Sequence, residues 1–356
     1  MMRKRSVILK GSIAIVILLV FGLWIRISLG VGSVSRAKCA YLKDHSISFN
    51  PEVWAIDSIS QSSFDNLYGE DEYDVYFYGE EHGYNFSHLF DLQYFKYLNE
   101  KYGVSLLLDE ISVSSAKMLD GFINSEECDT SILAAVLEDT RRNIPQRYTQ
   151  DYYQKWVDLR IFNIKKDSTQ RIHVKGLLPD DYFEGKYSSR DEAMLASFKL
   201  IQAEFREPYY CSVGQFHAMR DTISSVSDCL PFAGRLEEGG LRIHSTVMIP
   251  ASSYAYYSDG KKVMDSENGP FCYTYGIKNL MRCSNRGEVA LFAIDKPDSP
   301  YQAETKDLVL FSSLFNRYGY THPKSGHTTT DYFQSVLLIY GLNAPQEYKK
   351  SLDAPL

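Results

Sequence analysis

Short apolar runs alternate with longer amphipathic stretches along most of the chain. Each run has the length of a buried strand and is too short for a core helix. Runs of this kind lie at 75–78, 104–108, 172–174, 209–213, 243–249, 289–294 and 335–340. Because consecutive parallel strands need a crossover that is usually helical, this alternation predicts an α/β fold with a mainly parallel sheet flanked by helices.

The stretches between the runs predict the helices. Asn85 is expected to cap a helix that runs to about Lys101, and Ser188 or Ser189 is expected to cap another. Residues 112–165 are charge-rich and follow a helical pattern without a strand. We therefore predict a helical insertion over the carboxyl edge of the sheet.

The first 30 residues differ from the rest of the chain. Arg3, Lys4 and Arg5 precede an uncharged run at 11–25, which is short for a membrane span and typical of a signal-peptide core. We predict a signal anchor or signal peptide at 1–30, a polar, irregular linker at 31–70 that wraps onto the domain, and one α/β domain at 71–345. The positive-inside rule then predicts a membrane-anchored extracytoplasmic domain, periplasmic or at the cell surface, or a secreted one if the signal is cleaved.

Composition narrows the class of partner. Hydrophobic residues make up 44% of the chain and charged residues 23%, as in globular proteins with a real core. The net charge of −7 argues against nucleic acid as a partner, because phosphate binding needs a basic face. The 27 Tyr and 19 Phe indicate aromatic core packing, with an aromatic-lined cleft for a sugar or another bulky ligand as the alternative.

Six cysteines are present, and an even number in an exported chain permits disulfides in many pairings. No CxxC spacing occurs, which disfavours a zinc knuckle or a thioredoxin-like motif. Cys211 lies inside a predicted strand and is expected to be a core thiol.

Two tetrads directly follow predicted strands: Gly79-Glu80-Glu81-His82 and Gly214-Gln215-Phe216-His217. A glycine lets the backbone turn, so each histidine is expected just past the carboxyl end of its strand. Ligands bind at this edge of open α/β sheets. Two further predicted strands end near acidic pairs, Asp109-Glu110 and Asp180-Asp181, so carboxylates and imidazoles should converge there.

His82 and His217 are the first candidates for catalysis. In a hydrolase, one imidazole would take a proton from water while the other would stabilise or protonate the leaving group. Glu80 and Glu110 would orient the rings and fix their tautomers. If a divalent metal binds, His82, His217 and Glu110 are the candidate ligands, in a set that suits Zn, Mn or Co.

Arg190 is expected at the start of a helix, where the macrodipole disfavours a positive charge by roughly 0.3–1 kcal/mol. This position indicates an anionic partner, either a ligand, a developing oxyanion or Glu110. Other common chemistries lack their motifs: the chain has no GxSxG elbow, no phosphate-binding GxxxxGK[ST] loop, no GxGxxG and no HExxH.

The two tetrads, Glu110 and Arg190 occur in an order that resembles the superfamily of erythromycin esterase-like proteins, the TraB and TIKI proteases and the ChaN haem-binding lipoproteins. The resemblance covers about 145 residues, from Val75 to Met219. The esterase branch usually places its first Glu and His one residue further apart than Glu80 and His82.

The resemblance implies several activities: ester hydrolysis, metal-dependent peptide hydrolysis, and haem or iron binding. We expect a hydrolase that acts on a small-molecule or peptide substrate and uses the catalytic set Glu80, His82, Glu110, Arg190 and His217. The alternative is a haem- or iron-binding surface protein in which a His or a tyrosine such as Tyr78 or Tyr84 ligates iron. A third alternative is a member that binds a partner without catalysis.

Overall fold

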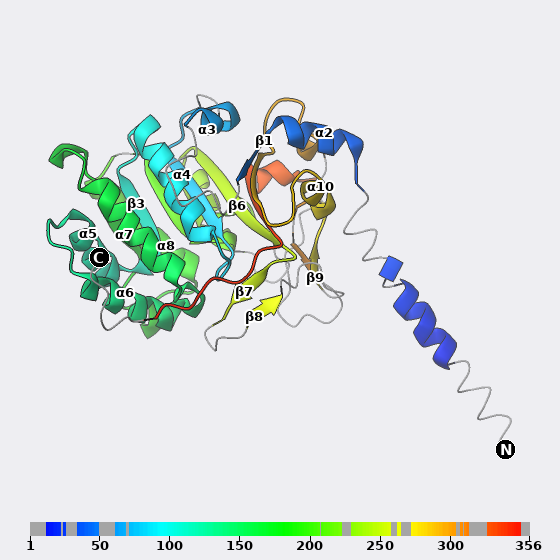
Figure 1. Ribbon diagram of the computed structural model, residues 1–356, viewed down its shortest axis with the longest axis horizontal. Coiled ribbons are helices and arrows are strands. Elements are labelled where there is room, and N and C mark those ends of the chain that lie inside the picture. Colours follow the sequence, from blue (N-terminus) through cyan, green and yellow to red (C-terminus); the bar gives the residue numbers. More distant parts are fainter. Residues whose placement is uncertain are drawn as a thin grey trace, which may run out of the picture.

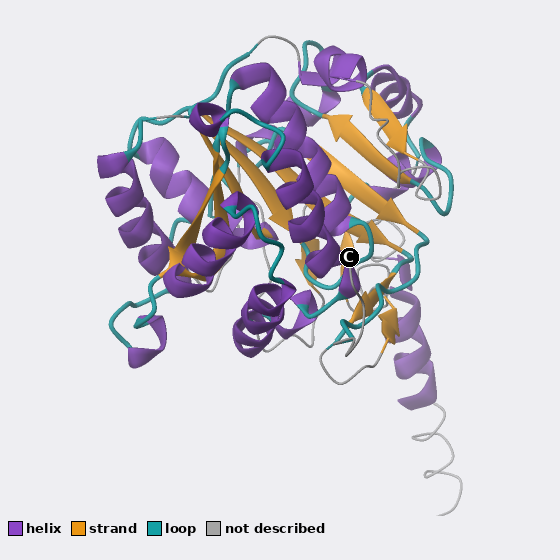
Figure 2. Ribbon diagram, turned by 60° about the vertical axis from the view of Figure 1, so that its left-hand side comes forward, coloured by secondary structure: helices purple, strands orange, loops and turns teal. Residues whose placement is uncertain are grey.

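Helices cover both faces of a central sheet in the computed structural model of the chain (Figures 1 and 2). The structure describes residues 12–22, 24–25, 34–49, 61–68, 71–206, 208–222, 229–257, 262–264, 272–303, 307–308, 310–312 and 326–349. The strands of the central sheet are β1 (Ser46–Phe49), β2 (Val75–Glu80), β3 (Leu106–Ser112), β4 (His173–Leu178), β5 (Tyr209–Gly214), β6 (Ile243–Ala251), β10 (Val289–Ala293) and β12 (Ser335–Tyr340). All seven strands expected from the apolar runs are present.

The sheet has the order β1-β10-β12-β6-β2-β5-β3-β4. Pairing is parallel from β12 to β4, while β10 is antiparallel to both β1 and β12. The predicted α/β fold with a mainly parallel sheet is therefore confirmed. From β2 the chain builds β3 and β4 on one side, returns to β5 beside β2, and then crosses to β6 on the other side. The carboxyl ends of β2 and β5 thus lie where the winding reverses, the usual ligand position in such sheets.

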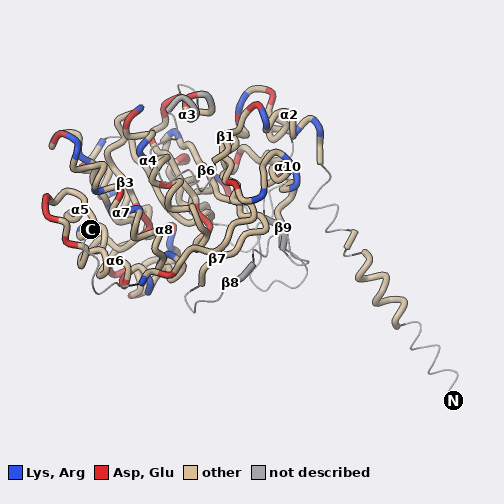
Figure 3. Tube along the Cα trace, viewed as in Figure 1, with Lys and Arg blue, Asp and Glu red and all other residues tan. Residues whose placement is uncertain are grey.

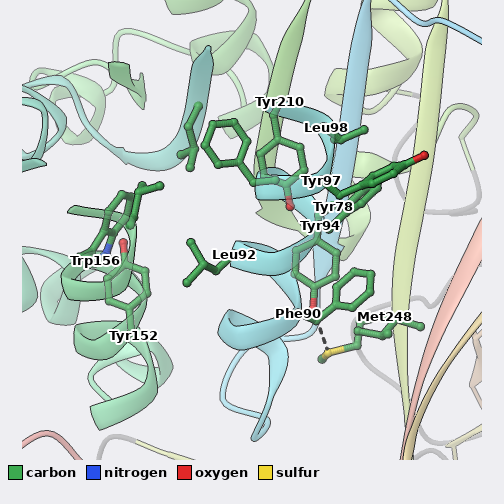
Figure 4. Close-up of a cluster of buried hydrophobic side chains, with 14 of the residues drawn as sticks. Tyr78, Phe90, Leu92, Tyr94, Tyr97, Leu98, Tyr152, Trp156, Tyr210 and Met248 are labelled. Carbon is green, nitrogen blue, oxygen red and sulfur yellow. Dashed lines mark hydrogen bonds between the residues drawn. The ribbon is translucent and has the colours of Figure 1, made fainter. Parts of the chain in front are cut away.

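The helices form two layers. They are α2 (Arg36–Asp44), α3 (Gln61–Tyr68), α4 (Ser87–Tyr102), α5 (Val113–Asn124), α6 (Thr130–Asn143), α7 (Gln150–Asn163), α8 (Arg190–Glu204), α9 (Phe232–Glu238) and α10 (Ile277–Arg282). Alternate side chains of β2 enter opposite cores: Tyr76 and Tyr78 join the cluster under α4 and α7, and Val75 and Phe77 join the cluster under α8 and α9. Figure 4 shows the first cluster, in which Tyr78 and Phe90 pack beside Met248. Burial on both faces explains why the strands are continuous apolar runs.

The segment between β3 and β4 is helical, as expected, and consists of α5, α6 and α7. Helix α5 packs along β4, and α7 packs against α4. A short 3-10 turn, η1 (Pro145–Arg147), lies between α6 and α7. It places the side chain of Arg147 beside Glu80 at the carboxyl edge of the sheet. Ser189 caps α8 as predicted, since its Oγ accepts from the backbone N–H of Glu192 at 3.2 Å.

Two local expectations are wrong. Asn85 does not cap α4: its Oδ1 accepts from the N–H of Phe86, and Phe86 itself is the cap residue with a φ of 67°. The segment 31–70 is not simply irregular, because its described parts form α2, β1 and α3. Strand β1 pairs with β10, and Phe49 at its end enters the core. Pairing with a distant strand leaves no local sequence signal, which explains the error.

At the amino terminus, residues 12–22 form a helix that points away from the sheet (Figure 1) and carries no charged residue (Figure 3). Its apolar side chains are exposed. Within the described ranges, no helix has both the length and the apolar character needed to cross a bilayer. The basic flank at Arg3, Lys4 and Arg5 lies outside the described residues, as do the remaining residues of the predicted signal segment apart from 12–22 and 24–25.

Candidate active site at the carboxyl edge of the sheet

Glu80, the last residue of β2, is buried and accepts three hydrogen bonds. The donors are His82 Nδ1 at 3.0 Å, Ser87 Oγ at 3.1 Å and Arg147 Nε at 2.5 Å. Burial alone would raise the pKa of this carboxyl, but the charge of Arg147, together with His88 and His82 when they are protonated, holds it well below its usual value. Glu80 is therefore an anion that orients the His82 ring, as the sequence analysis expected.

Glu110 near the end of β3 is also buried, and each of its oxygens accepts one strong hydrogen bond. Arg190 Nη1 donates to Oε1 at 2.6 Å, and the backbone N–H of Gly214 donates to Oε2 at 2.6 Å. Against the effect of burial, the nearby His217, His82 and arginine charges lower the pKa of Glu110 to about 2. The expected anionic partner of Arg190 is thus Glu110 itself.

His217 lies in η4 (Gln215–Ala218), the 3-10 turn that follows β5. Its Nδ1 lies 2.7 Å from Oδ1 of Asp191, and its Nε2 lies 3.7 Å from Oε1 of Glu110. Asp191 is held in place by the N–H of Phe232, which donates to the same oxygen at 2.7 Å. Burial opposes protonation, but the charges of Glu110 and Asp191 outweigh it and raise the pKa of His217. Asp191, rather than the predicted Glu110, therefore fixes this ring.

The three groups meet around Gly214. A Cβ added at Gly214 would lie 3.2 Å from Nε2 of His82, 3.3 Å from Oε2 of Glu110 and 3.5 Å from Cδ2 of His217. Gly214 and Glu80 are also Cα partners across β2 and β5. The structure thus brings together the two histidines and two glutamates that lie far apart in the sequence, and Arg190 joins them through Glu110.

A second group of charges lies behind the first, and most of it was missed in the sequence. Arg147 also donates to Asp109 at 2.7 Å, and Lys155 binds Asp91 at 2.5 Å and Asp109 at 3.4 Å. All four side chains are buried. The sequence does show Asp109 at a strand end, but Arg147 and Lys155 belong to the charge-rich helical insertion, where buried and solvated cations look alike. Asp191 could have been identified from the sequence as a site residue, because it directly follows the candidate Arg190.

One acidic pair that was expected to converge with the histidines, Asp180-Asp181, does not enter the site. Asp180 accepts from Ser114 Oγ at 2.8 Å, and Asp181 pairs with exposed Lys186 at 2.7 Å. Asp180 instead lines a hollow of about 410 Å³. The hollow also includes Tyr182, whose ring lies 5.7 Å from the guanidinium of Arg190, and the exposed ring of Phe183. It therefore adjoins the histidine site through Arg190.

The residues that the sequence analysis proposed as metal ligands are His82, His217 and Glu110. Within the part of the chain that the structure describes, no group of three His, Cys, Asp or Glu side chains is placed to hold a metal ion. Both oxygens of Glu110 are already occupied by strong donors, so the trio is not a ready ligand set in this arrangement. Binding of Zn, Mn or Co stays a prediction.

Haem or iron binding in the same cleft also stays a prediction. Tyr78, one of the two tyrosines considered as iron ligands, is fully buried. Its hydroxyl contacts Ser87 Oγ at 2.9 Å and the Met248 sulfur at 3.5 Å. Tyr84 is buried too and forms a β-bridge with Ala255. Neither arrangement favours iron ligation.

Comparison with known proteins gives a likeness of fold. No protein-family model and no curated protein matches the sequence. A Bacillus cereus protein solved by structural genomics superposes with a TM-score of 0.65 at 12% identity, over 88% of this chain and 98% of that chain. A succinoglycan biosynthesis protein superposes with a TM-score of 0.63 at 10% identity, over 88% of this chain and 99% of that chain. A mutant of the erythromycin esterase EreC in its open conformation superposes with a TM-score of 0.57 at 10% identity, over 86% of this chain and 99% of that chain. The chain therefore has a fold that an erythromycin esterase also has.

Proposed function

We propose that this chain is a hydrolase that cleaves an ester or amide bond with His82 and His217. One observation carries the proposal: each imidazole has its Nδ1 on its own carboxylate, and both rings meet at Gly214. Histidine oriented by a carboxylate is the arrangement of general acid–base catalysis. Structural packing alone does not require two such pairs at one edge of a sheet.

The two histidines would play different roles. With its Nδ1–H donated to Glu80, a neutral His82 ring has its lone pair on Nε2, beside Gly214, where it would take a proton from water. His217 has a raised pKa because of Glu110 and Asp191, so its protonated form would give a proton to the leaving group. After one turnover His82 has gained a proton and His217 has lost one. Proton exchange with solvent then returns both rings to their starting states.

Arg190 and Gly214 would support this pair through Glu110. The Glu110 carboxylate holds the Arg190 guanidinium at the start of α8 and accepts the N–H of Gly214 between the two rings. Substrate would approach from the hollow beside Arg190, where Tyr182 and Phe183 offer aromatic faces. A small-molecule or peptide substrate with an apolar or sugar ring would suit this hollow.

The fold comparison supports this reading, since the erythromycin esterase has the same fold. We further propose membership of the superfamily of erythromycin esterase-like, TraB/TIKI and ChaN proteins, based on the order of the two tetrads, Glu110 and Arg190. The basic amino terminus and the exposed apolar helix at 12–22 favour work outside the cytoplasm, tethered to the membrane or secreted. Fractionation of cells that express the full chain tests this location.

The test of the function is a panel of p-nitrophenyl esters and fluorogenic peptides assayed with wild type, His82→Gln and His217→Gln. Loss of one general acid or base is expected to lower kcat by about 10²–10⁴-fold. The matched control is His173→Gln, since His173 is an exposed histidine at the amino end of β4 that contacts Asp120. Circular dichroism checks that each variant is folded, and an absorption spectrum of the wild type tests for a Soret band. Wild-type rates in both site variants would refute the proposal.

A further inference from the structure

Two cysteines that are 244 positions apart meet where α2 contacts the end of α10. Cys39 lies on α2, and Cys283 is the cap residue at the end of α10. Cys283 Sγ lies 3.5 Å from the carbonyl oxygen of Cys39, and the Cys39 thiol is close enough to raise the pKa of the Cys283 thiol. Both are reduced in the structure.

The surrounding contacts hold α2 against α10, β10 and Asp307. The N–H of Ser35 donates to Oδ1 of Asn279 at 2.8 Å, and Lys38 forms an ion pair with Asp307. The Tyr41 hydroxyl donates to the Ala293 carbonyl at 3.2 Å. These contacts hold α2 against the part of the chain that carries Cys283, so the two cysteines stay next to each other.

The two thiols differ in access and environment. Cys39 is buried, with its sulfur 3.9 Å from the carbonyl oxygen of Asn279, whereas Cys283 is partly exposed. Burial and the contact with Cys39 raise the pKa of the Cys283 thiol, while the positive charges of Lys43 and Arg282 favour its thiolate. Cys283 is therefore the sulfur that an external disulfide would meet first.

We propose that Cys39 and Cys283 form a disulfide that joins α2 to the domain in the mature protein. The oxidant is a disulfide of the exchange type, either glutathione disulfide or a thiol–disulfide exchange protein. The Cys283 thiolate attacks one sulfur of the oxidant and releases one thiol, and the Cys39 thiolate then displaces the second thiol from Cys283. Two cysteine sulfurs are oxidised, the oxidant's disulfide is reduced, and the two cysteine protons pass to the two released thiols.

A Cys39–Cys283 disulfide would hold α2 in place close to the amino-terminal segment. Helix α2 directly follows the amino-terminal segment that contains the exposed apolar helix at 12–22. A bond from Cys39 to Cys283 would keep α2 on the domain even when the noncovalent contacts between α2 and α10 are lost. It is independent of the histidine site, since neither cysteine is among the residues that form that site.

The test is a thiol map of the full chain equilibrated with glutathione disulfide and glutathione, quenched with acid, and alkylated with N-ethylmaleimide under denaturing conditions. The expected result is one cross-linked peptide pair that contains Cys39 and Cys283, both of which stay unlabelled. Cys211→Ser, a buried core cysteine, is the matched control and should keep the cross-link, whereas Cys39→Ser should lose it and label Cys283. Full alkylation of both cysteines in the wild type, or a cross-link from either one to a different cysteine, would overturn the proposal.

Discussion

The buried pair between Arg147 and Glu80 allows the most direct test of how this site is held together. Both side chains are 1% exposed, and Arg147 Nε lies 2.5 Å from Glu80 Oε1. The change Arg147→Met removes the cation and keeps a long apolar side chain in its place. Glu80 then retains its charge and loses its nearest cation, while Asp109 retains Lys155 at 3.4 Å.

The size of the effect follows from that burial. Breaking a buried ion pair by removing one partner costs about 3–5 kcal/mol, because the remaining charge is left unpaired. With an m-value of about 3 kcal/mol per M, this predicts a fall of roughly 1–1.7 M in the urea midpoint. Glu80→Gln removes the other charge, so the double variant should be more stable than the sum of the single losses predicts. The expected coupling energy is about 1–3 kcal/mol.

The assay is urea unfolding of the four proteins of this cycle, followed by circular dichroism and by tryptophan fluorescence. Trp156 is a suitable probe because it is fully buried and lies 4.7 Å from Lys155. Arg142→Met is the control, since Arg142 is an exposed arginine on α6 and its loss should change stability by no more than about 0.5 kcal/mol. Additive losses in the double variant, or a loss below about 1 kcal/mol for Arg147→Met, would show that the pair does not hold the site.

Three further predictions concern the chemistry and assume the proposed hydrolase. The pKa of His217 is raised, so the stability and the acid catalysis that depend on its proton should be present below that pKa and be lost as the pH rises through it. Asp191→Asn should therefore move the alkaline limb of the pH–rate profile to lower pH. An unmoved limb would exclude His217 as the acid. Gly214→Ala should lower kcat far more than it lowers stability, because the new methyl group would contact His82 Nε2 at 3.2 Å. The overpacking itself costs about 1–3 kcal/mol of stability. Equal activity in the wild type and the variant would contradict the convergence of the two histidines at Gly214. Phe183→Ala should raise KM and leave kcat nearly unchanged, since the ring is exposed in the hollow, and an unchanged KM would place the substrate elsewhere.

Much of the fold follows from the order of the apolar runs. A strand that is buried on both faces needs a continuous apolar stretch, and β2, β5 and β12 begin and end close to where their runs do. Strand β1 could not be found in this way. It is four residues long, and the residues of β10 with which it pairs are 240 to 246 positions away in the chain, so its position depends on the finished sheet.

The candidate site was likewise predictable only in part. Glu80, Glu110 and the two histidines were predicted because they sit at strand ends, and the carboxyl ends of parallel strands must meet. Arg147 depends instead on how α6 and α7 pack over the sheet, which no local pattern specifies. The partner of His217 shows the same limit. Asp191 and Glu110 are both acidic and both near the edge, and the turn of the backbone at the start of α8 decides which one reaches Nδ1.

The charges at this edge do not balance without the histidines. Four buried carboxylates face three cations within the described residues. The carboxylates are Glu80, Asp91, Asp109 and Glu110, and the cations are Arg147, Lys155 and Arg190. Asp191 adds one more negative charge beside His217. Because an unpaired charge is costly when buried, a proton on His217 stabilises the folded chain. That proton is also the one that the proposed general acid would deliver, so a single electrostatic arrangement would serve both the stability of the fold and the chemistry of the site.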